Sequence, residues 1–129
     1  MASVALVASL ALIVYMGIVM SVGRARLRYQ VEAPAVTGNP IFERHFRVQQ
    51  NTVEQLVIFF PALFLFAQLV GEGLAAIVGL VFVAGRVIYA IGYVKDPARR
   101  GPGFLISSLA NATLVLGALV GSVRALLAG

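Results

Sequence analysis

The sequence contains no cysteine, no tryptophan and very little charge. Only 12% of its 129 residues are charged, against about a quarter in a soluble domain, whereas 60% are hydrophobic and the mean hydropathy is +0.96. Without cysteine there is no disulfide, thiolate nucleophile or cysteine metal site, and one histidine with five scattered carboxylates predicts no other metal site. The scarcity of charge excludes a soluble globular domain and indicates an integral membrane protein.

The basic residues outnumber the acidic ones by ten to five, which gives a net charge of +5. Long uncharged blocks separate them, so they do not form the continuous basic face that binds nucleic acid, and no nucleic-acid partner is expected. The positive charge is better interpreted as a signal of membrane topology.

Four apolar segments are long enough to cross a bilayer, each span requiring about 20 residues. A cleaved signal peptide is disfavoured for the first segment because no basic residue precedes it. We therefore expect an all-α integral membrane four-helix bundle that forms one domain over residues 1–129. The expected spans are at about 2–25, 44–71, 74–95 and 103–126.

Basic residues gather in the first and third connections between these spans, whereas the second connection holds only Glu72 and the amino terminus holds no charged side chain. By the positive-inside rule, we expect both basic loops in the cytoplasm and both termini outside. The short loops favour a bacterial inner membrane.

Polar side chains form a stripe at the same end of the second and third spans. Residues at spacings of three, four and seven lie on one face of a helix. Ionisable groups at membrane depth cost several kcal/mol unless they are paired or line a wet cavity, so they indicate a functional site. The stripe consists of Arg47, Asn51 and Glu54 on the second span and Arg86, Tyr89 and Tyr93 on the third.

A purely structural alternative is that Glu54 neutralises Arg47 or Arg86 in a buried pair. One carboxylate cannot satisfy two guanidinium groups together with the nearby hydroxyl and amide groups, and an unpaired donor in lipid is costly. Because donors outnumber acceptors, the stripe favours a ligand with carboxylates, while Glu54 could accept an ammonium group. An amino-acid-like or small-peptide ligand fits both demands.

Two segments resemble a known family, the membrane-associated proteins in eicosanoid and glutathione metabolism (MAPEG). Residues 47–54, RVQQNTVE, resemble the family signature R-x-x-x-N-x-x-E, and residues 85–93, GRVIYAIGY, are similar to its R-x-x-Y-x-x-G-Y region. With four spans, the resemblance covers nearly the whole chain. It implies a homotrimer that binds glutathione as a co-substrate between neighbouring subunits near the cytoplasmic face.

The resemblance also implies a role for individual residues. Arg100 falls where the family keeps the arginine that stabilises the glutathione thiolate, so it is the implied catalytic residue, although its neighbour Arg99 remains an alternative. The implied glutathione-binding residues are Arg26, Arg47, Gln49, Asn51, Glu54, Tyr89 and Tyr93.

The activity implied by the resemblance is that of a glutathione S-transferase, which conjugates the thiolate to a hydrophobic electrophile from the bilayer, with peroxidase activity as a possible addition. The alternative is a non-catalytic member of the family that binds lipid or acts as a scaffold. Relative to the leukotriene-forming members, Gln55 and Leu27 replace an expected tyrosine and arginine, and no tryptophan can cover a lipid tail. These departures disfavour leukotriene synthesis itself.

Overall fold

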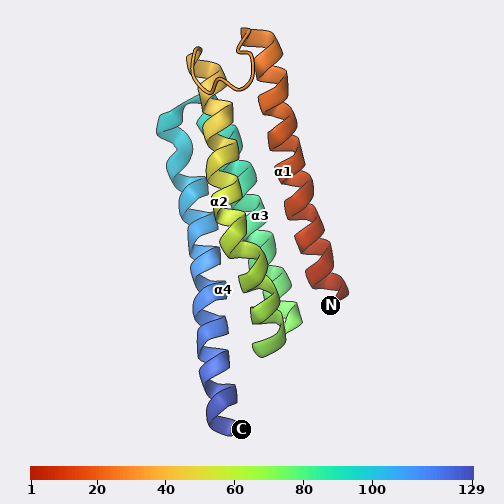
Figure 1. Cartoon of the computed structure of the whole chain (residues 1–129). Helices are drawn as coiled ribbons and strands as arrows, with labels where there is room; N and C mark the ends of the chain where they lie inside the picture. The colour runs from red at the N-terminus through yellow and green to blue at the C-terminus, as the bar shows by residue number, and fades with distance from the viewer.

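The computed structural model describes all residues, 1–129, as four long helices and one short one. Helices α1 (Ala2–Tyr29), α2 (Pro40–Leu69), α3 (Glu72–Lys95) and α4 (Gly101–Ala128) run side by side, with the 3-10 helix η1 (Pro97–Arg100) between α3 and α4. Figure 1 shows both termini near one end of the bundle and the α1–α2 loop and η1 at the other. The predicted all-α four-helix bundle is confirmed. All four long helices have the length and apolar composition to cross a membrane.

Helix α2 begins at Pro40, several residues before the expected start of the second span. The side chain of Asn39 accepts hydrogen bonds from the backbone nitrogens of Ile41 (2.9 Å) and Phe42 (3.0 Å). Proline suits the first helical position because the backbone N–H that it lacks would have no hydrogen-bond partner within the helix. The Asn39-Pro40 pair, expected to lie in the loop, therefore caps and starts the helix, and the loop shortens to residues 30–39.

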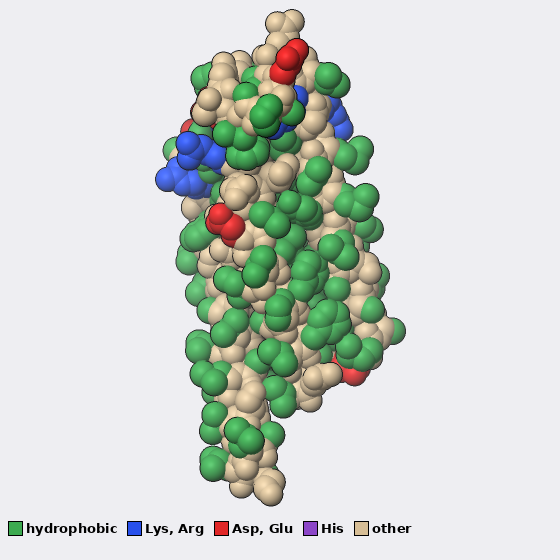
Figure 2. Space-filling view, viewed as in Figure 1, with side chains coloured by type: hydrophobic (Ala, Val, Ile, Leu, Met, Phe, Trp, Pro, Cys, Tyr) green, Lys and Arg blue, Asp and Glu red, His purple; other side chains and the backbone are tan.

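The interior of the bundle is a tight apolar core. The rings of Phe59 on α2 and Phe82 on α3 stack with centroids 4.0 Å apart, and Leu63 and Leu114 are fully buried beside them. Many other large apolar side chains point outward. Figure 2 shows hydrophobic side chains along the bundle and Lys and Arg near the loop end. This surface suits immersion in a bilayer, where outward apolar groups are solvated by lipid.

Glycines let α4 and η1 approach α3 closely. A Cβ atom added at Gly103 would lie 2.8 Å from the carbonyl oxygen of Gly85, and one added at Gly92 would lie 2.8 Å from the carbonyl oxygen of Arg99. Small residues at such crossings allow close backbone contact between membrane helices. The two contacts fix where η1 and the start of α4 lie against α3, and therefore where their side chains can reach.

Candidate functional site

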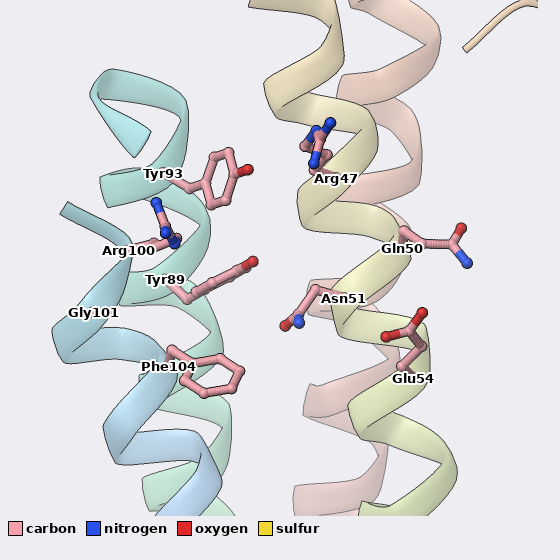
Figure 3. A pocket seen from close by; sticks show the side chains of 9 residues that line it. All are labelled: Arg47, Gln50, Asn51, Glu54, Tyr89, Tyr93, Arg100, Gly101 and Phe104. Atoms are coloured by element: carbon pink, nitrogen blue, oxygen red, sulfur yellow. The ribbon is translucent and has the colours of Figure 1, made fainter. Parts of the chain in front are cut away.

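A polar cavity of about 410 Å³ opens near the loop end of the bundle, between α2 on one side and α3, η1 and α4 on the other (Figure 3). We call it the polar cavity. It is lined by Arg47, Gln50, Asn51, Glu54, Tyr89, Tyr93, Arg100, Gly101 and Phe104.

Helix α2 contributes four of these side chains, spaced so that they share one face of the helix. Figure 3 shows Asn51 directed across the cavity towards the α3 side, whereas Gln50 points away from the tyrosines. Arg47, Gln50 and Glu54 are exposed on the single chain, and neither charged group makes an ion pair. Exposed charge on a helix this apolar is costly in lipid, so the face requires a cover.

The opposite wall carries two tyrosines and an arginine. The rings of Tyr89 and Tyr93, with centroids 5.6 Å apart, project towards α2 in Figure 3. Arg100 reaches the cavity from η1, where its Nη1 donates a hydrogen bond of 2.8 Å to the carbonyl oxygen of Pro97. Its neighbour Arg99 does not line the cavity. Phe104 closes the wall, with its ring centroid 6.3 Å from that of Tyr89.

Behind this wall lies Arg86, which is only 1% exposed and has no acidic partner. Its guanidinium donates to Asn51 Oδ1 (2.7 Å), Thr52 Oγ1 (3.0 Å) and Ser107 Oγ (3.1 Å), and lies 4.1 Å from the centre of the Tyr89 ring. Neutral oxygens and a ring face thus surround the buried cation and satisfy its two Nη groups, while its Nε is buried without a hydrogen-bond partner. The ion pair with Glu54 that the sequence left open is not formed.

This arrangement decides which way the Asn51 amide points. Arginine can only donate, so the group that Asn51 presents to Arg86 must be its oxygen. The Nδ2 of Asn51, which has no hydrogen-bond partner within the chain, is left as a donor for the polar cavity. Arg86 is therefore part of the support of the site and does not line it. Sequence spacing put it in the stripe but could not reveal Thr52 and Ser107 as its partners.

The structure brings six of the eight implied site residues together in the polar cavity and places Arg26 and Gln49 outside it. The Nη1 of Arg26 donates to the carbonyl oxygen of Ala35 (2.7 Å), and its guanidinium lies 4.8 Å from the centre of the Phe42 ring. These contacts tie the α1–α2 loop to α2. Gln49 is half-buried, and its side chain makes no hydrogen bond within the chain.

Three further residues line the cavity: Gln50, Gly101 and Phe104. Gly101 and Phe104 belong to the first turn of α4, and no sequence pattern indicated that this helix start lies beside the second span. Gln55, where the related pattern has tyrosine, instead faces α4, where Asn111 Nδ2 donates to its Oε1 (3.1 Å).

Comparison with known proteins agrees with the resemblance noted in the sequence. The model of the MAPEG family matches residues 4–120. The chain is 48% identical to the uncharacterized protein sll1147 of Synechocystis over 116 residues, which cover 90% of this chain and 85% of that protein. It is 46% identical to human microsomal glutathione S-transferase 2 over 102 residues, covering 78% and 69%. It is 35% identical to leukotriene C4 synthase of Cavia porcellus over 100 residues, covering 73% and 67%. The chain belongs to the MAPEG family and is an integral multi-pass membrane protein.

Proposed function

We propose that this protein is a membrane glutathione S-transferase, which holds glutathione in the polar cavity and activates its thiol for conjugation to hydrophobic electrophiles. The observation that carries the proposal is that Arg100 lines the same cavity as the hydrogen-bond donors of α2 and α3. Relatives named microsomal glutathione S-transferase 2 and leukotriene C4 synthase support the same class of reaction.

The charges of the polar cavity complement those of glutathione. The tripeptide has two carboxylates and one ammonium group, and the cavity offers the Arg47 guanidinium for a carboxylate and the Glu54 carboxylate for the ammonium group, which leaves the Arg100 guanidinium for the thiol. Guanidinium groups bind carboxylates through charge-assisted hydrogen bonds, and a carboxylate accepts from an ammonium group in the same way. The Asn51 amide and the hydroxyls of Tyr89 and Tyr93 add neutral hydrogen-bonding groups for the peptide backbone.

Arg100 is the proposed catalytic residue because it can stabilise the thiolate. A cysteine-type thiol has a reference pKa near 8.5, and lowering that pKa by about two units requires roughly 3 kcal/mol of preferential stabilisation of the anion. A unit charge about 4 Å away supplies about 4 kcal/mol at an effective dielectric near 20. Arginine suits this role because it keeps its own proton under all physiological conditions.

The thiolate sulfur then attacks an electrophilic carbon of the second substrate. A carbon–sulfur bond forms, and the bond to the leaving group, or one carbon–oxygen bond of an epoxide, breaks; an alkoxide product takes a proton from water. Phe104, 42% exposed, gives the cavity an apolar side towards the bilayer, from which a hydrophobic electrophile can enter. Reduction of lipid hydroperoxides to alcohols and water, in which two glutathione molecules are oxidised to the disulfide, is the expected additional activity.

We also propose that a homotrimer completes the site. The exposed Arg47 and Glu54 need a polar cover at membrane depth, and a second copy supplies one. Arg26 and Gln49, which lie outside the polar cavity of their own chain, are the residues proposed to reach a neighbour's site. Mixed trimers of Arg26→Ala chains and Arg100→Ala chains should then regain activity, because some sites combine the intact Arg26 of one chain with the intact Arg100 of its neighbour. If each site instead used residues of a single chain, the mixed trimers would stay inactive.

We further propose that the loop end faces the cytoplasm of a bacterial inner membrane and that both termini lie outside. The chain has no cysteine, so single cysteines at Thr37 in the α1–α2 loop and at Ala128 give an unambiguous test. In intact cells, a membrane-impermeant thiol reagent should label the Ala128→Cys variant and spare Thr37→Cys. The reverse pattern would invert the topology.

The function is tested by adding glutathione to the detergent-purified protein at neutral pH and recording the ultraviolet absorbance of the thiolate. We expect a signal in the wild type that disappears in Arg100→Ala and persists in Arg99→Ala, the matched control one residue away. A loss in Arg99→Ala alone would reassign the role to that residue. Absence of any signal, together with absence of glutathione binding by calorimetry, would favour the non-catalytic lipid-binding alternative.

A further inference from the structure

A second cavity of about 500 Å³ lies between α1, α2 and α3, and it shares no lining residue with the polar cavity. We call it the apolar groove. Its α3 wall is formed by side chains that alternate with Tyr89 and Tyr93 and therefore face the other side of the helix. It is lined by Val14, Gly17, Ile18, Ser21, His45, Val48, Val87, Ala90, Ile91, Val94 and Lys95.

The groove is apolar along its length and polar only at its loop end, where Ser21, His45 and Lys95 lie. Gly17 keeps its α1 wall open, because a Cβ atom added there would meet nothing within 4 Å. An elongated apolar molecule with one polar end would match this distribution.

A basic crevice of about 180 Å³ continues from that polar end, since Ser21 and His45 line both spaces. The crevice adds Arg24, Arg28 and Tyr29 from the last turns of α1. No acidic residue lines either space, and none of these basic groups forms an ion pair. The charge of the crevice is therefore uncompensated by the protein.

Glu32, the acidic residue nearest in sequence to Arg28, does not line the crevice and forms no ion pair, and two further acidic side chains are engaged elsewhere. The Glu43 carboxylate accepts from the backbone nitrogen of Gly38 (3.3 Å), and the Asp96 carboxylate accepts from that of Ala98 (3.0 Å). Neither is available to neutralise Arg24, Arg28 or Lys95. An anion from outside the chain can take that place.

Hydrogen bonds also fix the direction of the histidine ring. Ser21 Oγ donates to the carbonyl oxygen of Ile18 (2.7 Å), so its one proton is used, and in its 3.3 Å contact with His45 Nδ1 it must accept. His45 therefore carries its proton on Nδ1, and Nε2 is left without a partner in the chain. Once protonated, Nε2 can donate to an anionic oxygen.

From these observations we propose that the apolar groove and the basic crevice together bind one anionic phospholipid. Its phosphate lies in the crevice among Arg24, Arg28 and His45, and one acyl chain lies in the groove over Gly17. Guanidinium groups bind phosphate oxygens through charge-assisted hydrogen bonds, and basic pockets between membrane helices suit anionic headgroups. The proposal is independent of glutathione, because the two sites share no residue.

The test uses the full protein purified in mild detergent, incubated with phosphatidylglycerol or phosphatidylcholine and observed by native mass spectrometry, which reports bound lipid and oligomeric state together. We expect retention of phosphatidylglycerol over phosphatidylcholine. The Arg24→Gln/Arg28→Gln variant should lose about tenfold or more of that retention, since two cationic contacts with the headgroup are removed. Arg99→Gln, which removes one charge from the same end outside the crevice, should retain the lipid.

A second pair of variants tests the acyl-chain half. Gly17→Leu, whose Cβ has open space, should fill the groove and reduce lipid retention, and Gly23→Leu on the same helix, also with open space at its Cβ but outside the groove, is the control. Equal retention of both lipids, unchanged in the Arg24→Gln/Arg28→Gln and Gly17→Leu variants, would overturn the proposal. A change of oligomeric state in Gly17→Leu, with no lipid bound to the wild type, would instead show that a second copy of the chain occupies the groove.

Discussion

Arg86 Nη2 donates a 2.7 Å hydrogen bond to Asn51 Oδ1, and this contact joins the interior of the bundle to the polar cavity. The same guanidinium lies against the Tyr89 ring, so one buried side chain orients a lining residue on α2 and another on α3. Since Arg86 itself does not line the cavity, we regard it as a positioning residue.

Replacing Arg86 by lysine should weaken glutathione binding while the helical fold persists. An ammonium group cannot keep the planar arrangement of donors that reaches Asn51, Thr52 and Ser107 together. We expect a roughly tenfold loss of affinity in calorimetry, consistent with a free-energy cost of about 1.4 kcal/mol. Far-ultraviolet circular dichroism should stay unchanged.

A double-mutant cycle separates this positioning role from a general loss of stability. If Arg86 acts through Asn51, Arg86→Lys should cost little further affinity in an Asn51→Ala background. Additive losses would contradict the positioning role and indicate two independent effects.

Gly92→Ala should impair thiol activation without altering the cavity residues themselves. The added Cβ would lie 2.8 Å from the carbonyl oxygen of Arg99, so η1 must shift away from α3 and carry Arg100 with it. The thiolate absorbance at neutral pH should fall towards that of glutathione in solution. Gly73→Ala, whose Cβ meets nothing within 4 Å, is the matched control, and equal behaviour of the two variants would refute the argument.

The sequence predicted the fold because hydrophobicity alone specifies membrane helices. It also predicted the stripe on α2, since the spacing of Arg47, Asn51 and Glu54 places these side chains on the same face of an α-helix. What spacing within one helix cannot supply is which neighbour each face meets. For that reason the partners Thr52 and Ser107 of Arg86, and the position of Phe104 in the cavity wall, required the structure.

Local signals were harder to interpret than periodic ones. Asn39 and Pro40 are common both in loops and at helix starts, and only the backbone geometry decides between them. The position of the η1 helix, which presents Arg100, likewise depends on a close contact between Gly92 on α3 and Arg99 on η1. These two residues are seven apart along the chain but belong to different elements.

Asn39→Ala should destabilise the start of α2 by about 1 kcal/mol, the usual contribution of a side-chain N-cap. Two backbone nitrogens lose their acceptor when the Asn39 carboxamide is removed. The expected result is a lower midpoint of thermal unfolding in detergent. Thr37→Ala, an exposed loop residue without a hydrogen bond, should leave the midpoint unchanged; a matching fall there would show that the loop as a whole, and not the cap, matters.

The Asn111–Gln55 contact offers a prediction on stability alone, because neither residue lines the polar cavity. Asn111 Nδ2 donates to Gln55 Oε1 (3.1 Å), while Asn111 Oδ1 is buried without a partner. Removing one member of a buried polar pair strands the other, at a cost of about 1 to 3 kcal/mol, whereas removing both avoids that penalty. Gln55→Leu should lower the unfolding midpoint, although Asn111 Nδ2 keeps its 3.3 Å hydrogen bond to the backbone carbonyl oxygen of residue 55, and Asn111→Leu should lower it too because Gln55 Oε1 loses its donor. The double variant should equal or exceed the wild type in its unfolding midpoint, and all three should keep the thiolate signal. Additive losses of stability in the double variant would mean that the two side chains contribute through packing and not through their hydrogen bond.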